Sequence, residues 1–277
     1  MITQTNQSLP YCKYSGTGNI FLLFDNRKQL FPTHPSSFVE KLCNPASGPG
    51  ADGIILLETA SLPDADFTMR IFNSDCSEAE MCGNGIRCLA MFILKLGMSK
   101  KKYRIQTAER LLQIHYKKDL VTVEMGQASD IQWDLTIDAL GREWTCHTIN
   151  TGVLHTVLFL PDLDNIDIHA LGKAIRFHPT FAPAGTNVDF AQLESNRSIT
   201  IRTYERGVEA ETFACGTGAT ASALVAAHLY QADSPVTINT RSGGTIFISF
   251  NQKGRGRWEK IAMTGPATLV EQGSIQF

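Results

Sequence analysis

The sequence has no excess of either charge. Its 277 residues include 25 lysines and arginines against 27 aspartates and glutamates, which gives a formal net charge of −2. Nucleic acids and anionic membranes are usually bound by a concentrated surplus of basic residues, so neither partner is expected. The one basic run, residues 95–104, follows a predicted helix, where cations interact favourably with the helix dipole.

Long apolar runs and a regular cysteine framework are also missing. No stretch of about 18 consecutive apolar residues exists, and residues 1–16 have neither the basic region nor the apolar core of a signal peptide. The seven cysteines are irregularly spaced, and no CxxC pair has histidine partners that would suggest structural zinc. We therefore expect a cytoplasmic protein with reduced thiols and without a bound metal.

The residues that are present predict a packed α+β protein, with 43% hydrophobic and 19% charged residues. The predicted strands are mostly short, alternating and bounded by turn residues, and cover 19–27, 52–61, 65–73, 103–109, 111–126, 155–162, 198–206, 236–250 and 259–277. Helices are predicted at 35–44, 84–97 and 218–231, with a weaker one at 167–177.

Two of these helices are apolar on nearly every face, so each is expected to be buried inside a strongly curved sheet. Each is opened by a Cys-Gly-X-Gly motif, at Cys82 and at Cys215, about half the chain length apart. The triplet Glu-Ala-Glu stands shortly before each cysteine. The pattern indicates an internal duplication with a boundary near residues 123–129.

A glycine-rich turn that opens a buried helix presents unpaired backbone N–H groups at the positive end of the helix dipole, which suits a carboxylate or phosphate. A cysteine there is expected to have a lowered pKa and to act as a general base. If the halves close on each other, Cys82 and Cys215 would face opposite sides of one carbon. One thiolate would remove an α-proton and the other thiol would return a proton, which inverts the stereocentre.

Other interpretations of the motif are weaker. A single Cys-Gly-X-Gly is more often a structural turn, but two in matching halves favour catalysis. A dithiol redox centre usually has its cysteines close together in a CxxC motif. The sequence offers no evident Schiff-base lysine for pyridoxal phosphate and no GxGxxG or GxxxxGK[ST] motif after a strand.

The sequence resembles the diaminopimelate epimerase family nearly from end to end, through "YSGTGNIF", "GPGADGI", "RIFNSDCSEAEMCGNGIRC", "VEMGQ", "NTGVLHTV", "GTNVDF", "YERG" and "ACGTGATAS". The resemblance implies two pseudosymmetric domains, each a barrel-like sheet around a central buried helix, with the active site in the interdomain cleft. Residues 1–125 with a C-terminal strand at 264–277 would carry Cys82, and residues 126–263 would carry Cys215. It also implies a homodimer that interconverts LL- and meso-diaminopimelate with no cofactor.

Residue by residue, the resemblance makes Cys82 and Cys215 the acid/base pair. The substrate α-carboxylate would be bound by the backbone N–H groups of Gly83, Asn84, Gly216 and Thr217. The polar groups of the substrate would be bound by Asn19, Asn73, Asn187, Glu205 and Arg206. His155 would lie near the site, where it would orient a thiol or bind a backbone carbonyl.

The sequence departs from the family pattern at the positions that contact the far end of the substrate. Val153 replaces an asparagine, Gly53 replaces a glutamine, and the loop Val208–Phe213 lacks the usual glycine. Removing polar contacts usually relaxes selectivity more than it harms the reaction, so we expect activity on shorter acidic amino acids such as glutamate as well. Cys76 replaces a common glycine and is expected to be an inert loop cysteine, with an oxidation partner as the alternative.

Two alternative functions stay open. Another racemase or isomerase of the same superfamily, such as a proline racemase or a phenazine-type isomerase, would share the fold. A non-catalytic amino-acid binding module would keep the site without proton transfer, although the retention of both thiols disfavours it.

Overall fold

The computed structural model describes residues 8–79 and 81–276, and the chain divides into two compact units. Unit 1 runs to Val123 and resumes at Pro266, whereas unit 2 comprises Glu124–Gly265. In the described part of the chain, none of the helices has the length and apolar character needed to cross a membrane.

Unit 1 contains a mixed sheet with two helices. Its strands are β1 (Ser8–Gly16), β2 (Asn19–Asp25), β3 (Gly53–Thr59), β4 (Phe67–Asn73), β5 (Glu78–Ala79), β6 (Lys102–Gln106), β7 (Leu111–Lys117), β8 (Leu120–Gly126) and β18 (Thr268–Gln276). They are ordered β18-β1-β2-β3-β4-β6-β7-β8, with β5 also paired to β4. Helix α1 (Ser36–Cys43) connects β2 to β3, and α2 (Gly83–Lys95) connects β5 to β6.

The alternation of side chains along the strands of unit 1 gives the sheet two apolar faces. Leu22 and Leu56 pack in one buried cluster with Val39 of α1. The preceding residue of β3, Ile55, points the other way and lies against Gly85 of α2. Strands β2 and β3 are therefore buried on both sides, as parallel neighbours covered by helices usually are.

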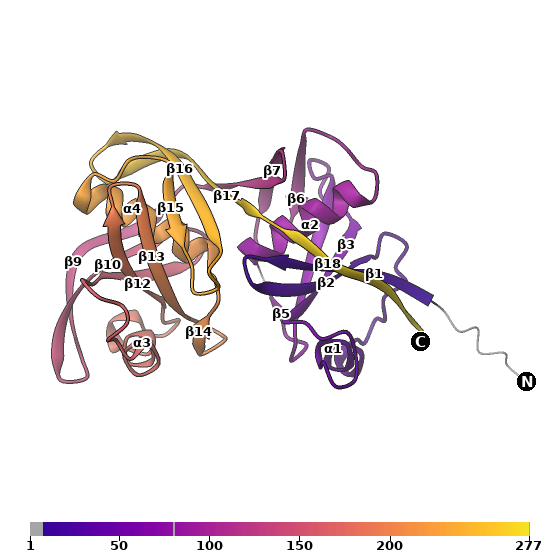
Figure 1. Cartoon of the computed structure of the whole chain (residues 1–277), viewed down its shortest axis with the longest axis horizontal. Helices are drawn as coiled ribbons and strands as arrows, with labels where there is room; N and C mark the ends of the chain where they lie inside the picture. The colour runs from indigo at the N-terminus through magenta and orange to yellow at the C-terminus, as the bar shows by residue number, and fades with distance from the viewer. Residues whose placement is uncertain (1–7, 80, 277) are drawn as a thin grey trace, which may run out of the picture. The chain divides into compact units, whose positions relative to one another are not determined.

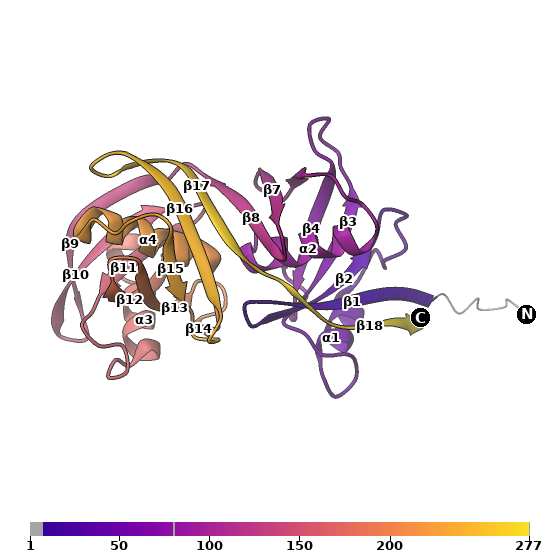
Figure 2. The same cartoon turned by 45° about the horizontal axis from the view of Figure 1, so that its top comes forward.

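Unit 2 has the same kinds of element. Its strands are β9 (Ser129–Ala139), β10 (Arg142–Asn150), β11 (Leu154–Phe159), β12 (Asn187–Ser195), β13 (Ser198–Glu205), β14 (Ala210–Thr212), β15 (Val236–Asn239), β16 (Thr245–Gly254) and β17 (Arg257–Pro266). Helix α3 (Ile168–Arg176) and a short 3₁₀ turn (Pro179–Phe181) connect β11 to β12, and α4 (Gly216–Tyr230) connects β14 to β15. Figure 2 shows α4 among the strands of this unit, and it contacts β10, β11, β12, β13, β15 and β16.

The two units repeat one topology. From β1 to β8, successive neighbours pair antiparallel, parallel, antiparallel, parallel, antiparallel and antiparallel, with β5 as an extra partner of β4. The strands from β10 to β17 pair in the same series, with β14 as an extra partner of β13. Both helices after the first parallel crossover and both helices opened by a cysteine occupy equivalent places. The structure thus contains the duplication that the sequence indicates.

Each unit carries one more strand outside this repeat. In unit 2, β9 precedes β10 and pairs with it antiparallel. In unit 1 the equivalent place beside β1 is taken by β18 from the other end of the chain, and Figure 1 shows this yellow strand beside indigo β1. The C-terminal strand therefore completes unit 1.

All four predicted helices are present, and the two central ones are deeply buried. Three runs predicted as single strands each contain two strands: 111–126 comprises β7 and β8, 236–250 comprises β15 and β16, and 259–277 comprises most of β17 together with β18. Strands β1, β5, β9, β10, β12 and β14 were not predicted. In β9, Asp130 and Asp134 adopt positive φ where the register with β10 shifts. Ile131, Trp133, Leu135 and Ile137 nevertheless alternate with polar residues, so the strand pattern was present in the sequence and was missed.

Candidate functional site

Cys82 is the N-cap residue of α2. Its backbone is extended, with φ −143° and ψ 117°, and its Sγ accepts a hydrogen bond from the backbone N–H of Gly85 at 3.3 Å. The first residues of the helix, Gly83 and Asn84, are buried, while the thiol itself is partly exposed. The thiol therefore sits at the positive end of a buried helix, beside its first N–H groups.

A polar network lies beneath this cap. The Asn84 side-chain amide donates to Asn19 Oδ1 at 2.6 Å, so two predicted substrate-binding residues are joined in unit 1. The fully buried Arg87 donates to Asn84 Oδ1 at 2.8 Å, to Thr17 Oγ1 at 2.6 Å and to the carbonyl of Gly83 at 2.9 Å. Burial lowers the pKa of Arg87, but a guanidinium stays protonated in proteins, so a cation lies under the first turn of α2.

The side chain of Asn73 forms its hydrogen bond outside this network. It ends β4, its side chain is exposed, and its amide donates to Ser77 Oγ at 2.9 Å across a tight turn. Cys76 occupies a positive-φ position of the same turn, which explains why glycine suits that position.

Cys215 is the N-cap residue of α4, with nearly the same backbone geometry as Cys82. Its φ is −120° and ψ is 116°, and its Sγ accepts from the N–H of Gly218 at 3.4 Å. Unlike Cys82, it is buried, and it also lies 3.4 Å from the hydroxyl oxygen of Thr217.

The surroundings of Cys215 favour its neutral thiol. Burial raises the pKa of Cys215 well above its usual value, and the carboxylates of Glu205 and Asp189 raise it further. The hydrogen bonds from Thr217 and Gly218 act in the opposite direction but are smaller effects. Burial likewise raises the pKa of Glu205. The lowered pKa expected from the helix terminus is therefore wrong for Cys215, because desolvation outweighs the dipole.

His155 is fully buried and connects to this cap. Its Nδ1 lies 2.6 Å from Asp189 Oδ2, and its Nε2 lies 2.9 Å from Thr217 Oγ1. The other carboxylate oxygen of Asp189 accepts from the hydroxyl of Thr203 at 2.7 Å. A chain of polar side chains from β11, β12 and β13 thus ends at the first turn of α4.

Asn187 and Arg206 lie close together in unit 2. The side chain of Asn187 accepts from the backbone N–H of Arg206 at 2.9 Å and donates to the carbonyl of Leu154 at 3.1 Å. The polar atoms of Asn187 thus fix the loop that carries Arg206, next to Glu205 at the end of β13.

The departures from the family pattern have visible structural counterparts. Gly53 begins β3, where a Cβ atom would approach the carbonyl oxygen of Phe72 to 2.6 Å, so the backbone here has no room for a side chain. Val153 is partly buried in the turn before β11. Val208 and Phe213 are each 57% exposed at the ends of the loop around β14. Large apolar side chains therefore stand open to solvent beside Arg206 and Cys215 in the chain.

Sequence analysis missed Arg87, Asp189 and Thr203 as members of these networks. The available signal was a charged residue within an apolar run: Arg87 in a helix otherwise filled with apolar residues, and Asp189 in the strand NVDFA. Charged side chains are almost never fully buried without partners, so such positions mark polar networks.

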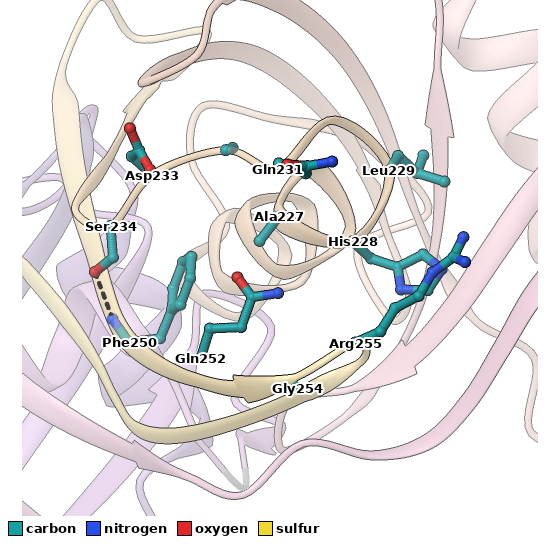
Figure 3. Close-up of a pocket in the computed structure, with 11 residues that line it drawn as sticks. Ala227, His228, Leu229, Gln231, Asp233, Ser234, Phe250, Gln252, Gly254 and Arg255 are labelled. Carbon is teal, nitrogen blue, oxygen red and sulfur yellow. Dashed lines mark hydrogen bonds between the residues drawn. The ribbon is translucent and has the colours of Figure 1, made fainter.

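No group of acidic, histidine and cysteine side chains suited to a metal ion occurs among residues 8–79 and 81–276. A pocket of about 730 Å³ lies at the C-terminal end of α4 and is lined by residues such as Ala227, His228 and Arg255 (Figure 3). The helix rise places Ala227 roughly 18 Å along the axis from Cys215. The pocket contains none of the predicted site residues and is separate from the cysteine cap.

Solved structures with low sequence identity share the fold. A phenazine biosynthesis protein of the PhzF family from Bacillus anthracis aligns with a TM-score of 0.73 at 12% identity, covering 97% of this chain and 99% of that one. A probable proline racemase from Agrobacterium radiobacter aligns with a TM-score of 0.71 at 16% identity, covering 96% and 92%. At these identities the two structures establish the architecture only.

Sequence relatives are more specific. The diaminopimelate epimerase family model matches residues 11–131 and 147–270. The diaminopimelate epimerase of Hydrogenobaculum sp. is 38% identical over 276 residues, and that of Aquifex aeolicus is 37% identical over 278 residues. Each alignment covers 96% of this chain and 98% of the relative. The chain therefore belongs to the diaminopimelate epimerase family.

Proposed function

We propose that this protein interconverts LL- and meso-diaminopimelate by moving the α-proton with two thiols and without pyridoxal phosphate. The observation that carries the proposal is the repeated cap. Cys82 and Cys215 each begin a buried helix, and each thiol accepts a hydrogen bond from the third residue of that helix. The full-length similarity to proteins named diaminopimelate epimerase supports this choice of substrate.

In the proposed reaction, one thiolate removes the α-proton and the other thiol protonates the opposite face. The backbone N–H groups of Gly83, Asn84, Gly216 and Thr217 bind the α-carboxylate. The α-hydrogen of an amino acid is very weakly acidic, so the negative charge that develops must be stabilised by fixed dipoles in a site without bulk water. The buried first turns of α2 and α4 support this requirement.

The remaining polar residues recognise the two ends of the substrate. Arg206 binds the distal carboxylate, for which a planar guanidinium is well suited, and Glu205 accepts from an ammonium group. Asn19 and Asn73 complete the contacts in unit 1. Asn187 acts by fixing the backbone at Arg206, since both ends of its side-chain amide are bonded to the main chain.

We further propose that recognition of the distal end is relaxed, so that glutamate is also a substrate. Gly53 and Val153 offer no side-chain polar group, and the Val208–Phe213 loop presents apolar side chains to solvent. A site that forms fewer hydrogen bonds with the distal group rejects analogues lacking that group less strongly.

The test is proton NMR in D₂O with reduced enzyme and no added pyridoxal phosphate, using LL-diaminopimelate in one sample and L-glutamate in another. We expect loss of the α-proton signal in both samples, and loss of this exchange in Cys82→Ala and Cys215→Ala. Cys76→Ser is the matched control, because it removes a thiol outside the two caps. Ligand binding without exchange would mark a binding module, and exchange with glutamate absent would refute the relaxed specificity.

The quaternary structure and location that the family resemblance implies are part of the proposal. We propose a cytoplasmic homodimer, with diaminopimelate as its small-molecule partner. Sedimentation equilibrium of the reduced protein would show twice the 30.5 kDa chain mass, and a single-chain mass across the concentration range would contradict it.

A further inference from the structure

Cys76 is a partly exposed thiol on the turn that carries Asn73. The backbone N–H of Cys76 donates to the carbonyl of Asn73 at 2.9 Å, and the N–H of Asn73 donates to the carbonyl of Ser77 at 2.9 Å. Cys76 has φ 66°, in the left-handed region that suits glycine better than a residue with a Cβ atom. The turn therefore carries a thiol despite an unfavourable backbone conformation, and none of the roles assigned above uses that thiol.

A second thiol, that of Cys43, lies next to this turn. Cys43 is the last residue of α1 and is buried in the apolar cluster of unit 1, and the Cys76 side chain packs against the same cluster. The carbonyl of Cys43 accepts from the N–H of Ala51 at 3.0 Å. Two residues later, Gly53 begins β3 and pairs with Asn73 at the end of β4. The end of α1 is therefore brought beside the turn that carries Cys76.

The two thiols differ in their accessibility to a reagent in solution. Burial raises the pKa of Cys43 to about 11, and the negative charges of Asp52 and of the Cys76 thiolate add to this effect. The electrostatic influence of Cys76 on Cys43 agrees with their packing in one cluster. Since the thiolate is the reactive form of cysteine, a buried thiol with a raised pKa resists direct oxidation. The partly exposed Cys76 is the thiol that an oxidant reaches first.

We propose that Cys76 and Cys43 form a disulfide when the protein meets a peroxide, and that this bond controls the position of the Asn73 turn. The Cys76 thiolate takes one oxygen of hydrogen peroxide and becomes a sulfenic acid, and the other oxygen leaves as hydroxide. The sulfur of Cys43 then bonds to the sulfur of Cys76. The S–O bond breaks, and its oxygen leaves as water with the proton of Cys43. A dithiol reductant reverses the modification.

The exposed turn is the part of this pair that must adjust when the bond closes. A disulfide requires the two Cα atoms to lie within about 4.4–6.8 Å of each other. Cys43 is fixed by the helix and by its buried neighbours Val39 and Leu42, whereas the side chains of Asn73 and Ser77 are exposed. The bond therefore draws the turn towards α1, and Asn73 moves with it. This consequence for the substrate rests on the proposed function, whereas formation of the bond does not.

The first test detects the bond by mass spectrometry and needs no substrate. Reduced full-length protein is treated with hydrogen peroxide, the remaining thiols are alkylated, and the chain is digested without reductant by trypsin and a glutamate-specific protease. These proteases release Cys43 in residues 42–58 and Cys76 in residues 71–78, apart from Cys82. We expect the two peptides to be joined, and the joined species to disappear after treatment with dithiothreitol.

Two variants identify the partners. Cys76→Gly removes the exposed thiol at a positive-φ position that suits glycine, so the turn keeps its shape. Cys43→Ala removes the buried thiol and keeps a small apolar side chain. Neither variant should give the joined peptides, and in Cys43→Ala the unresolved sulfenic acid of Cys76 should accumulate as sulfinic acid. A bond from Cys76 to Cys82, or no joined peptide in the wild type, would overturn the proposal.

The second test separates the turn from the two caps by steady-state kinetics with LL-diaminopimelate. Oxidation of Cys82 or Cys215 inactivates molecules and lowers kcat, and Cys76→Gly is the matched control because it keeps both of these thiols. The bond between Cys43 and Cys76 should instead raise KM by about tenfold, which corresponds to the loss of one hydrogen bond to the substrate. An unchanged KM in protein that carries the bond would refute the control of the Asn73 turn. Joined peptides in a protein without epimerase activity would support the disulfide and refute the proposed function alone, so the two proposals can fail separately.

Discussion

Cys82 and Cys215 occupy the same backbone position in two copies of one topology, and they differ in the charges around them. Both are extended N-cap residues whose Sγ accepts from the third helical residue. Five residues after each cysteine, a side chain donates to the carbonyl of the first helical residue at 2.9 Å. In unit 1 this side chain is the guanidinium of Arg87, and in unit 2 it is the hydroxyl of Thr220.

The two copies therefore share the N-cap geometry of the cysteine but differ in the charged side chains that surround the thiol. A buried cation under the first cap interacts with Cys82, whereas the second cap faces the carboxylates of Glu205 and Asp189. A nearby cation favours the ionised form of an acid, and nearby anions favour its neutral form. A two-base inversion needs one thiolate and one thiol at the same moment. Divergent charges around matching caps favour that pairing.

The largest expected effect comes from removing the cation. Arg87→Met leaves the hydrogen-bond acceptors of Gly83, Thr17 and Asn84 without this donor, and we expect unit 1 to lose roughly 4 kcal/mol of unfolding free energy. The equivalent change in unit 2, Thr220→Val, removes one hydrogen bond and should cost about 1 kcal/mol. All three tryptophans lie in unit 2, so urea unfolding followed by far-UV circular dichroism and by tryptophan fluorescence separates the units. Equal costs at the two positions would show that the cation has no special role.

A second matched pair lies at the third residue of each helix. Gly218→Ala places a methyl group against the fixed carboxylate of Asp189, and we expect epimerase activity to fall by about 100-fold, equivalent to roughly 2.7 kcal/mol. Gly85→Ala meets the end of the Ile55 side chain at 2.9 Å, which can rotate, so a loss of less than about tenfold is expected. Initial rates with LL-diaminopimelate measure both. If Gly218→Ala lost less activity than Gly85→Ala, the Asp189 carboxylate would move aside more easily than its two hydrogen bonds suggest.

The two cysteine N-caps could be predicted from the sequence, but the charged side chains that surround them could not. Glycines after Cys82 and Cys215, followed by long apolar runs, locate both caps and both central helices. Asp189 and His155 lie on different strands and 34 positions apart, so no local period links them. The same holds for Arg87, whose partner Thr17 belongs to the turn between β1 and β2. A sequence can show that a buried charge needs partners, but tertiary pairing decides which ones it has.

The strand that completes each repeat offers another comparison. In unit 2, β9 and β10 are joined by the two-residue turn Leu140–Gly141, and both residues have positive φ, as in a type I′ hairpin. In unit 1, β18 reaches β1 from the opposite end of the chain, and side-chain contacts must help to hold it. Sequence periodicity found the 259–277 run but could not reveal this partner, because the pairing has no local turn.

Tyr11 is the contact that should matter most for β18. Its hydroxyl donates to Glu271 Oε1 at 2.6 Å, and we expect Tyr11→Phe to lower the stability of unit 1 by about 1.5 kcal/mol. Burial, together with the Glu271 carboxylate, raises the pKa of Tyr11 to about 12. The stabilisation is therefore complete below the ordinary tyrosine pKa near 10 and is lost as the pH rises towards 12. The difference in urea midpoint between the wild type and Tyr11→Phe should be smaller at pH 11 than at pH 8. An equal difference at both pH values would contradict the pairing.

The smallest expected effect sharpens the same comparison at the β9–β10 turn. Leu140 has φ 56° and its side chain is 64% exposed, so it bears the cost of a left-handed conformation without burying much surface. Leu140→Asn supplies the residue that type I′ turns prefer and should raise the stability of unit 2 by about 0.5 kcal/mol. Leu140→Ala is the control, because it removes the same apolar side chain but retains the left-handed strain. If both variants shifted the tryptophan-detected urea midpoint equally, the gain would come from loss of the exposed leucine, and the turn would not be what holds β9 in register.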